Sequence, residues 1–215
     1  HQSYQRVLEQ YQNVLYLCVG SVFTGNYEVA CQWKREHDPE NRFIVLDTTA
    51  ASGRLAVLVR ATAQFARTCD NPSEVVAFAE KAIEHAEEYV FLDKLKYLAA
   101  GGRLSKSSAF FGDMLSMKPI VSPLAEGAKK VGIARNRDAQ LSFAYEKLKN
   151  ALGKDDKALI FLEYSNNKEW VEQGPKLEIQ KQYPNAEIIL QPLSLTSGVH
   201  MGPGTWALAF LPALE

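Results

Sequence analysis

Short apolar runs alternate with segments of helical period along almost the whole chain, and this alternation constrains the fold more than any other feature. Residues 14–20 (VLYLCVG) and 42–49 (RFIVLDTT) are apolar runs of strand length, and each is followed by a helix-like segment. In the second of these segments, residues 52–69, apolar positions recur at three- and four-residue spacing. Strand, helix, strand, helix is the order of a parallel sheet with crossover helices, so we expect an α/β protein.

The pattern changes after about residue 88. Residues 118–127 (KPIVSPLAEG) and 128–137 (AKKVGIARNR) predict a hairpin that turns at Glu126 and Gly127. Further strands are expected at 89–93, 158–164, 186–194 and 205–212, and further helices at about 138–152 and 168–183. Because a hairpin pairs antiparallel, the sheet of this part is expected to be mixed.

The chain is therefore expected to have two lobes. Residues 1–88 are predicted to form a parallel, Rossmann-like α/β lobe, and residues 89–215 a second α/β lobe with a mixed sheet. A length of 215 residues is enough for one large α/β domain or for two small ones packed together.

Composition excludes several classes of function. The 24 basic and 25 acidic residues form no basic block, which argues against nucleic-acid binding. The longest apolar stretches run about 7 to 9 residues, short of the roughly 20 that span a bilayer. Cys18, Cys31 and Cys69 form no CxxC pair and no metal-ligand spacing. We expect a cytoplasmic protein with reduced, packed thiols and no metal site.

The loop GSVFTGN, residues 20–26, follows the first predicted strand and leads into a helix, the place where open α/β sheets bind ligands. Backbone N–H groups at a helix start, together with the Ser21 and Thr24 hydroxyls, can hold an anionic oxygen. Gly20 and Gly25 allow close approach. Residue types alone favour the simpler interpretation, a helix capped by Thr24 or Ser21. The loop is neither a P-loop nor GxGxxG, so nucleotide binding has little support.

Two further motifs combine glycine with a basic or titratable side chain. Gly101 and Gly102 precede Arg103, which could meet an anion or could simply follow a helix C-cap. In HMGPG, glycines and a proline are expected to fix a rigid turn around His200. A lone histidine is more often structural than functional.

Ser21 and His200 together also allow a serine hydrolase as an alternative. Ser21 is not in a GxSxG elbow, however, and no third member of a triad is marked out. Asp47 and Asp93, at the ends of strand-like runs, are the nearest candidate acids.

The stretch SSAFFGDMLSMKPIV, residues 107–121, is rich in aromatic residues and methionine. Its helical spacing is typical of ordinary core, and its alternative is the wall of an apolar ligand channel. In the second interpretation the pocket is lined by Phe110, Phe111, Met114 and Ile120.

Taken together and in this order, five stretches resemble the DegV family of bacterial fatty-acid-binding proteins, which has an EDD-type fold. They are GSVFTGNYEVA, FIVLDTTAASGRLAVLV, YVFLDKLKYLAAGGRLSKSSAFFGDMLSMKPIV, GAKKVGIARNRDAQ and HMGPGTWALAF. They recur across nearly the whole chain. The third stretch and the H-x-GPG turn are the most specific, whereas any one motif alone is weak.

The resemblance implies a two-domain α/β protein that buries a fatty acid. The carboxylate is held by small hydroxyl residues after a strand, and the histidine of the last motif lies nearby. In characterised relatives the bound fatty acid is presented to a separate kinase subunit, which makes acyl phosphate from it with ATP. The resemblance therefore implies a fatty-acid kinase partner, no catalysis by this chain, and no cofactor besides the fatty acid as ligand.

The family's residues are carried over by position. Ser21 matches the second serine of the loop Ser-Ser-x-Leu-Ser-Gly-Thr-Tyr, and Thr24 takes the place of its third serine. Gly25 and Tyr27 match directly, whereas Gly20 and Asn26 depart from the pattern. The residues that the resemblance places at the carboxylate are Ser21, Thr24, Gly25 and His200. Those that it places in supporting turns or at a partner are Gly20, Gly101, Gly102, Arg103, Arg135 and Gly202.

One family segment has no counterpart in this sequence. It carries an Asp-Ser-Thr strand end and a Thr-Ser-x-Pro motif whose threonine helps to bind the carboxylate. We therefore expect the first lobe to be incomplete at its N-terminus, either because the chain is a fragment or because an upstream region supplies the segment. The stretch LAEGAKKVGIARNR also resembles family members in which this domain follows a dihydroxyacetone-kinase-like domain.

Three functions remain open at this point. The first is a lipid carrier in which His200 contacts the carboxylate. The second is an enzyme, either an acyl hydrolase that uses Ser21 and His200 or a phosphotransfer partner of a kinase. The third is an interaction module of a larger kinase-like protein with no bound lipid.

Overall fold

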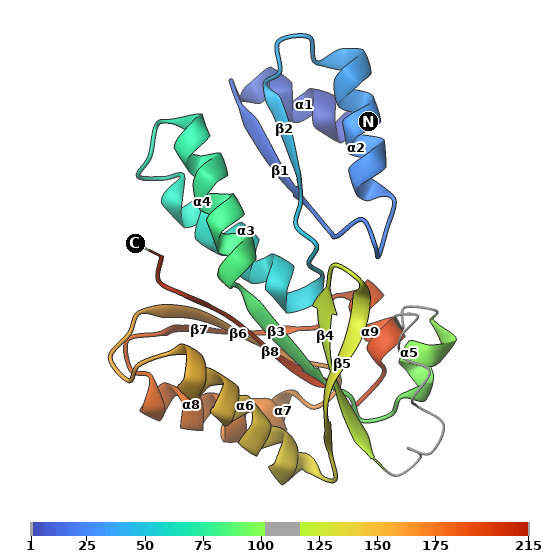
Figure 1. Cartoon of the computed structure of the whole chain (residues 1–215), viewed down its shortest axis with the longest axis vertical. Coiled ribbons are helices and arrows are strands. Elements are labelled where there is room, and N and C mark those ends of the chain that lie inside the picture. The colour runs from blue at the N-terminus through green and yellow to red at the C-terminus, as the bar shows by residue number, and fades with distance from the viewer. Residues whose placement is uncertain (1, 102–116, 215) are drawn as a thin grey trace.

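A computed structural model describes residues 2–101 and 117–214 of the chain (Figure 1). Within these ranges a two-stranded parallel sheet, β1-β2, accompanies a six-stranded mixed sheet of order β5-β4-β3-β8-β6-β7. The small sheet and its two helices occupy one end of the molecule, and the larger sheet with its helices occupies the other (Figure 1). The expected α/β class, with one parallel and one mixed sheet, is confirmed.

The small sheet pairs β1 (Val14–Cys18) with β2 (Phe43–Asp47) in parallel. Helix α1 (Gln2–Gln10) and helix α2 (Asn26–His37) contribute to its core. That core is aromatic, since Tyr4, Tyr16, Trp33 and Phe43 have ring centroids 5.1 to 6.0 Å apart. The Cys18 thiol is fully buried there, and burial raises its pKa to about 12. It therefore stays protonated at neutral pH.

The larger sheet is mixed because a hairpin and a β-α-β unit both join it. Strands β4 (Lys118–Leu124) and β5 (Gly127–Ala134) form the predicted hairpin, and β4 pairs antiparallel with β3 (Glu87–Phe91). At the sheet centre β8 (Trp206–Pro212) runs antiparallel to both β3 and β6 (Ala158–Tyr164). Strand β7 (Glu187–Pro192) pairs with β6 in parallel.

Helices cover both faces of this sheet. They are α3 (Ser52–Phe65), α4 (Pro72–His85), α5 (Lys96–Ala100), α6 (Arg137–Ala151), α7 (Lys168–Val171), η2 (Glu172–Lys176), α8 (Leu177–Gln182) and α9 (Leu195–Met201). Helices α3 and α4 pack on one face, with Phe161 and Ala209 in the shared core. Helices α6 to α8 pack on the other face, with Ile160 and Phe210. Alternate residues of β6 and β8 thus point to opposite helical layers.

The single helix expected at 168–183 is divided by a wider turn. Pro175 lies inside the π-helical segment η2, between α7 and α8. Proline has no backbone N–H and its ring clashes with the preceding turn, so the regular i to i−4 ladder cannot continue through it.

Two lobes meeting near residue 88 were expected, and β3 does begin there, at Glu87. Helices α3 and α4 nevertheless pack on the six-stranded sheet, with α3 contacting β6 and β8. Helices α3 and α4, which were expected to belong to the first lobe, therefore cover one face of the sheet of the second lobe. A division into units that fold separately stays a prediction.

In the part of the chain that the structure describes, every helix is too short or too polar to cross a bilayer.

Candidate functional site

A cavity of about 1110 Å³ lies between the loop that precedes α2, helix α3, the six-stranded sheet and helix α9. Its volume is slightly above the roughly 300–1,000 Å³ that is usual for small-molecule sites. Most of its lining residues are apolar. Polar side chains enter from four places: the loop before α2, the start of α3 with the ends of β6 and β7, the middle of α3 at Arg60, and helix α9.

Helix α3 gives the cavity a long apolar wall. Leu55, Ala56, Val59 and Ala63 all line it, at the three- and four-residue spacing of one helix face. From Leu55 to Ala63, at 1.5 Å per residue, this wall extends about 12 Å. Val90, Val121 and Phe161 line the sheet side.

Thr24 lines the cavity from the loop before α2. Its Oγ1 accepts the Asn26 backbone N–H at 2.9 Å, at the first residue of α2. Thr24 thus pairs one free N–H at the start of α2, although the N-cap residue of that helix is Gly25. A threonine hydroxyl that accepts at a helix start still has its own hydrogen to donate, so Thr24 can also bind an anionic oxygen in the cavity. Gly25 is exposed between Thr24 and α2 and is not among the cavity-lining residues.

Ser21 differs from the sequence expectation, because it does not line the cavity and interacts with Asp47 instead. Its backbone N–H donates to Asp47 Oδ1 at 3.1 Å, and Thr49 donates to the same oxygen at 3.0 Å. Burial opposes ionisation of Asp47, but the Ser21 hydroxyl and these N–H groups outweigh it and lower the pKa of the carboxyl. Ser21 thus fixes the loop against Asp47. Gly20 adds a further bond, in which its N–H donates to the Ala50 carbonyl at 2.7 Å.

His200 lines the cavity from the last turn of α9 rather than from the rigid turn that the sequence suggested. The helix ends at Gly202, whose φ of 79° lies in the left-handed region that favours glycine. A Cβ at Gly101 would overlap Nδ1 of the His200 ring, so only glycine allows the end of α5 to lie against it. The structure thereby brings together two motifs that are a hundred residues apart in the sequence.

A buried pair of carboxyls, missed by the sequence analysis, lies at the start of α3. Glu163 lines the cavity, where its carboxyl accepts from the Ser52 hydroxyl at 2.9 Å and from the Gln191 amide at 3.0 Å. Behind it, Glu88 accepts the N–H groups of Gly53 and Arg54 at 3.1 and 2.9 Å. Glutamate inside the apolar runs of 86–92 and 158–164 was the signal that could have revealed the pair.

Burial raises the pKa of both carboxyls. For Glu88, which is fully buried, the charge of Glu163 adds to this effect, and its pKa lies well above the usual value. For Glu163 burial also dominates, although bonds from Gln191 and Ser52 partly offset it. The pair therefore retains a proton at a pH where an exposed glutamate has lost it.

The other expected site residues lie elsewhere. Ile120 is packed in the core with α6 to α8, on the far face of the sheet from the cavity, and its neighbour Val121 lines the cavity instead. Arg135 is exposed after β5, and Asp93 forms an ion pair with Lys118. Gly102, Arg103, Phe110, Phe111 and Met114 lie outside the described residues.

The described residues do not assemble a serine hydrolase triad around Ser21 and His200. No hydrogen bond joins Ser21 to His200 among the described contacts, and the Ser21 hydroxyl is directed to Asp47. Across residues 2–101 and 117–214, no three histidine, cysteine, aspartate or glutamate side chains gather as a metal site requires.

Comparison with known sequences yields one family. Its profile, DegV, is described as an uncharacterised protein family and matches residues 1–213. A DegV domain-containing protein of Streptococcus pyogenes serotype M3 is 31% identical over 199 residues, which are 91% of this chain and 68% of that protein. A DegV domain-containing protein of Clostridium perfringens is 26% identical over 214 residues, 98% of this chain and 73% of that one.

Solved structures agree with the fold. A DegV family protein from Thermus thermophilus, reported for its fatty acid binding, superimposes with a TM-score of 0.89 at 21% identity, over 99% of this chain and 75% of its own. The Bacillus subtilis fatty acid binding protein DegV gives 0.87 at 21% identity, over 99% and 75%. The Fatty Acid Kinase B3 protein of Streptococcus pneumoniae, loaded with linoleic acid, gives 0.84 at 21% identity, over 99% and 76%.

Proposed function

The chain belongs to the DegV family, and from that premise we propose that it binds one long-chain fatty acid in the cavity beside α3. The observation that carries the proposal is the shape of this cavity. It has an apolar wall about 12 Å long and polar groups, Thr24 and His200 among them, that can meet a carboxylate. Similar folds that are described as fatty acid binding support it.

The acyl chain supplies most of the affinity in this proposal. Each methylene removed from water contributes about 0.8 kcal/mol, so a chain of some sixteen carbons makes roughly 10 kcal/mol available. Leu55, Val59 and Phe161 are side chains against which such a chain can lie. Affinity then does not depend on a strong charge–charge contact at the head group.

The carboxylate needs donors, because an unpaired buried charge costs several kcal/mol. We assign this part to the Thr24 hydroxyl and to the His200 ring, with Ser21 and Gly25 supporting the loop. A neutral imidazole offers one N–H donor and a protonated one offers two. Glu163 is compatible with a bound carboxylate only while its pair with Glu88 holds a proton, because two adjacent negative charges would repel.

On this proposal the protein is a carrier without chemistry of its own, and it presents the fatty acid to a kinase subunit or a kinase-like domain. The Streptococcus pneumoniae relative, a fatty acid kinase B protein, supports this assignment. A cytoplasmic location fits the three free thiols among the described residues.

Titration calorimetry of delipidated protein with oleate tests the head-group assignment. We expect Thr24→Val and His200→Ala each to lower the affinity about tenfold, since each removes a bond to a charged group. His85→Ala is the matched control, because the His85 ring is exposed and bonds to the Lys81 carbonyl of its own helix, away from the cavity lining. Methyl oleate, which lacks the carboxylate, should bind wild type and His200→Ala equally. Unchanged oleate affinity in both site variants would refute the assignment.

A further inference from the structure

Helix α9 carries His200 into the cavity wall, yet it has little hydrophobic anchorage. None of its seven residues is fully buried, and Leu195 and Val199 are 91% and 73% exposed. Met201, in its last turn, is partly buried against the core that contains Leu98 and Ala207. Helical stability in proteins comes mostly from packing of an apolar face, and a helix this short is marginal without it. Something besides burial must therefore fix the position of the His200 ring.

The loop between β6 and α7 provides such a fixing point through Gly204, four residues after His200. Asn167 Nδ2 donates to the Gly204 carbonyl at 3.1 Å, while its Oδ1 accepts the Ser165 N–H at 2.9 Å. The orientation of this amide is set by its partners, since a carbonyl requires a donor and an N–H requires an acceptor. Asn166 Oδ1 and the Ser165 carbonyl both accept the Gly204 N–H, at 2.8 and 2.9 Å.

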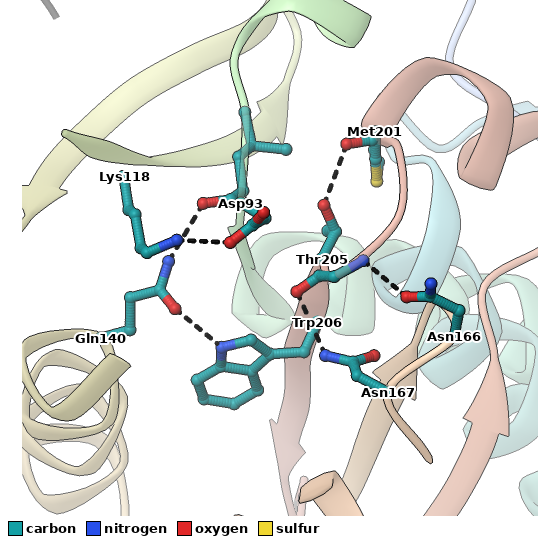
Figure 2. Close-up of polar contacts among 10 residues, drawn as sticks. Asp93, Lys118, Gln140, Asn166, Asn167, Met201, Thr205 and Trp206 are labelled. Atoms are coloured by element: carbon teal, nitrogen blue, oxygen red, sulfur yellow. Dashed lines mark hydrogen bonds and ion pairs between the residues drawn. The ribbon is translucent and has the colours of Figure 1, made fainter. Parts of the chain in front are cut away.

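A second bond ties the turn to the end of α9 itself. The Thr205 hydroxyl donates to the Met201 carbonyl at 2.9 Å, and Thr205 is fully buried. Figure 2 shows Asn166 and Asn167 directed at the backbone next to Thr205, and the Thr205 hydroxyl directed back at Met201. The bonds at Gly204 and the bond between Thr205 and Met201 thus hold the segment that follows His200 at both ends.

We infer that Asn167 and Thr205 are positioning residues that fix the His200 ring in the cavity wall, Asn167 by holding Gly204 and Thr205 by holding Met201. The inference rests on the proposed function, in which His200 contacts the fatty-acid head group. Both residues act through His200 and neither lines the cavity.

The test is a double-mutant cycle on oleate affinity. Asn167→Asp is isosteric but removes the donor and sets a carboxylate oxygen against the Gly204 carbonyl. We expect it to weaken binding about tenfold in wild type and to have no further effect in the His200→Ala background. Asn185→Asp is the control, because Asn185 makes the same kind of bond, to the Asp155 carbonyl at 2.9 Å, away from α9. It should leave affinity unchanged.

Thr205→Val, which keeps the packing and loses only the hydroxyl, gives a second route if Asn167→Asp does not fold. The same pattern is expected of it. An equal loss of affinity with and without His200 would overturn the inference, because the substitution would then act on the site by another path.

A readout without ligand separates this inference from the proposed function. Asn167→Asp should shift the imidazole NMR signals of His200 in the ligand-free protein, and Asn185→Asp should not. If wild type binds no fatty acid, the proposed function fails, while these shifts still decide whether Asn167 positions His200. Unshifted His200 signals would overturn the positioning role.

Discussion

His200 acquires its candidate role from its neighbours rather than from its residue type. The GGRLS and HMGPG motifs were separate features of the sequence, and each had an ordinary explanation, the first as a helix C-cap and the second as a rigid turn around a structural histidine. In the folded chain the end of α5 lies against α9, with Gly101 next to the imidazole. Their order along the sequence predicted a family site, but contact between them depends on how α5 and α9 pack.

Gly101→Ala is expected to weaken fatty-acid binding, because its methyl group would push the His200 ring from its place. Gly198→Ala is the matched control, since an added methyl there meets no atom of the described residues within 4 Å and Gly198 lies on α9 itself. Titration with oleate measures both. Equal affinities of the two variants would contradict the account of Gly101.

The buried pair Glu88 and Glu163 predicts a pH dependence of stability. Both folded pKa values are raised, so above the ordinary value of about 4.3 the folded state holds more protons than the unfolded state. The free energy of unfolding must then fall as pH rises from that value through the raised ones, by about 1.4 kcal/mol per pH unit for each proton. The stabilising contribution is fully present below the ordinary pKa.

Glu163→Gln should flatten this fall, because glutamine resembles the protonated acid and removes one of the two titrating groups. Urea unfolding at several pH values measures the slope. Glu187→Gln is the control: bonds from Gln64 and Arg60 lower the pKa of this exposed group, so its linkage has the opposite sign. A slope that Glu163→Gln leaves as steep as in wild type would contradict the assignment.

At the scale of elements, helix α3 serves two surfaces. One face packs with α4 on the six-stranded sheet, and the stripe of Leu55, Ala56, Val59 and Ala63 lines the cavity. The spacing in 52–69 predicted a helix with an apolar face. It did not predict that part of this face stays open, because periodicity records which residues avoid water and not what covers them.

Ala56→Trp should block the cavity from within this stripe and abolish retention of a fatty acid, with the protein still folded. Ala66→Trp, at the exposed end of α3, is the matched control. Mass spectrometry of lipid extracted from each purified variant measures the loss. Retention of fatty acid by the Ala56 variant would show that the ligand lies elsewhere.

Most elements were predictable because their signals are local. The hairpin β4-β5 and the central strands follow from apolar runs. Asn71 and Pro72 at the start of α4 are residue types typical of a helix start, and Asn71 accepts the Ser73 N–H as a cap. Helix α9 was missed because its sequence, LTSGVHM, has a glycine, few strong helix formers and no buried face. It depends on its cap at Ser194 and on the contacts after His200.

The candidate site was only partly predictable, for reasons of geometry. Next to the cavity, strand β4 carries apolar residues on both of its faces. Its pairing with β5 also shifts register between Ile120 and Val121. No sequence pattern can then tell which of the two faces the cavity. Ser21 illustrates the same limit, since a hydroxyl next to a strand end can face a ligand or, as here, Asp47.

At the scale of the whole molecule, the fold is that of the DegV family. The chain spans 68% of the length of the Streptococcus pyogenes relative and 73% of the length of the Clostridium perfringens relative. The arrangement of a small parallel sheet beside a larger mixed sheet follows from the sequence order of strands and helices. The packing of α3 and α4 across the expected boundary does not, because it joins residues more than a hundred positions apart.

Native mass spectrometry of the purified chain, followed by denaturing lipid extraction, tests the central proposal most directly. We predict a mass excess over the bare polypeptide that resolves on extraction into one long-chain fatty acid per chain. A bare mass that stays unchanged after incubation with oleate or palmitate would contradict the proposal that the cavity beside α3 binds a fatty acid.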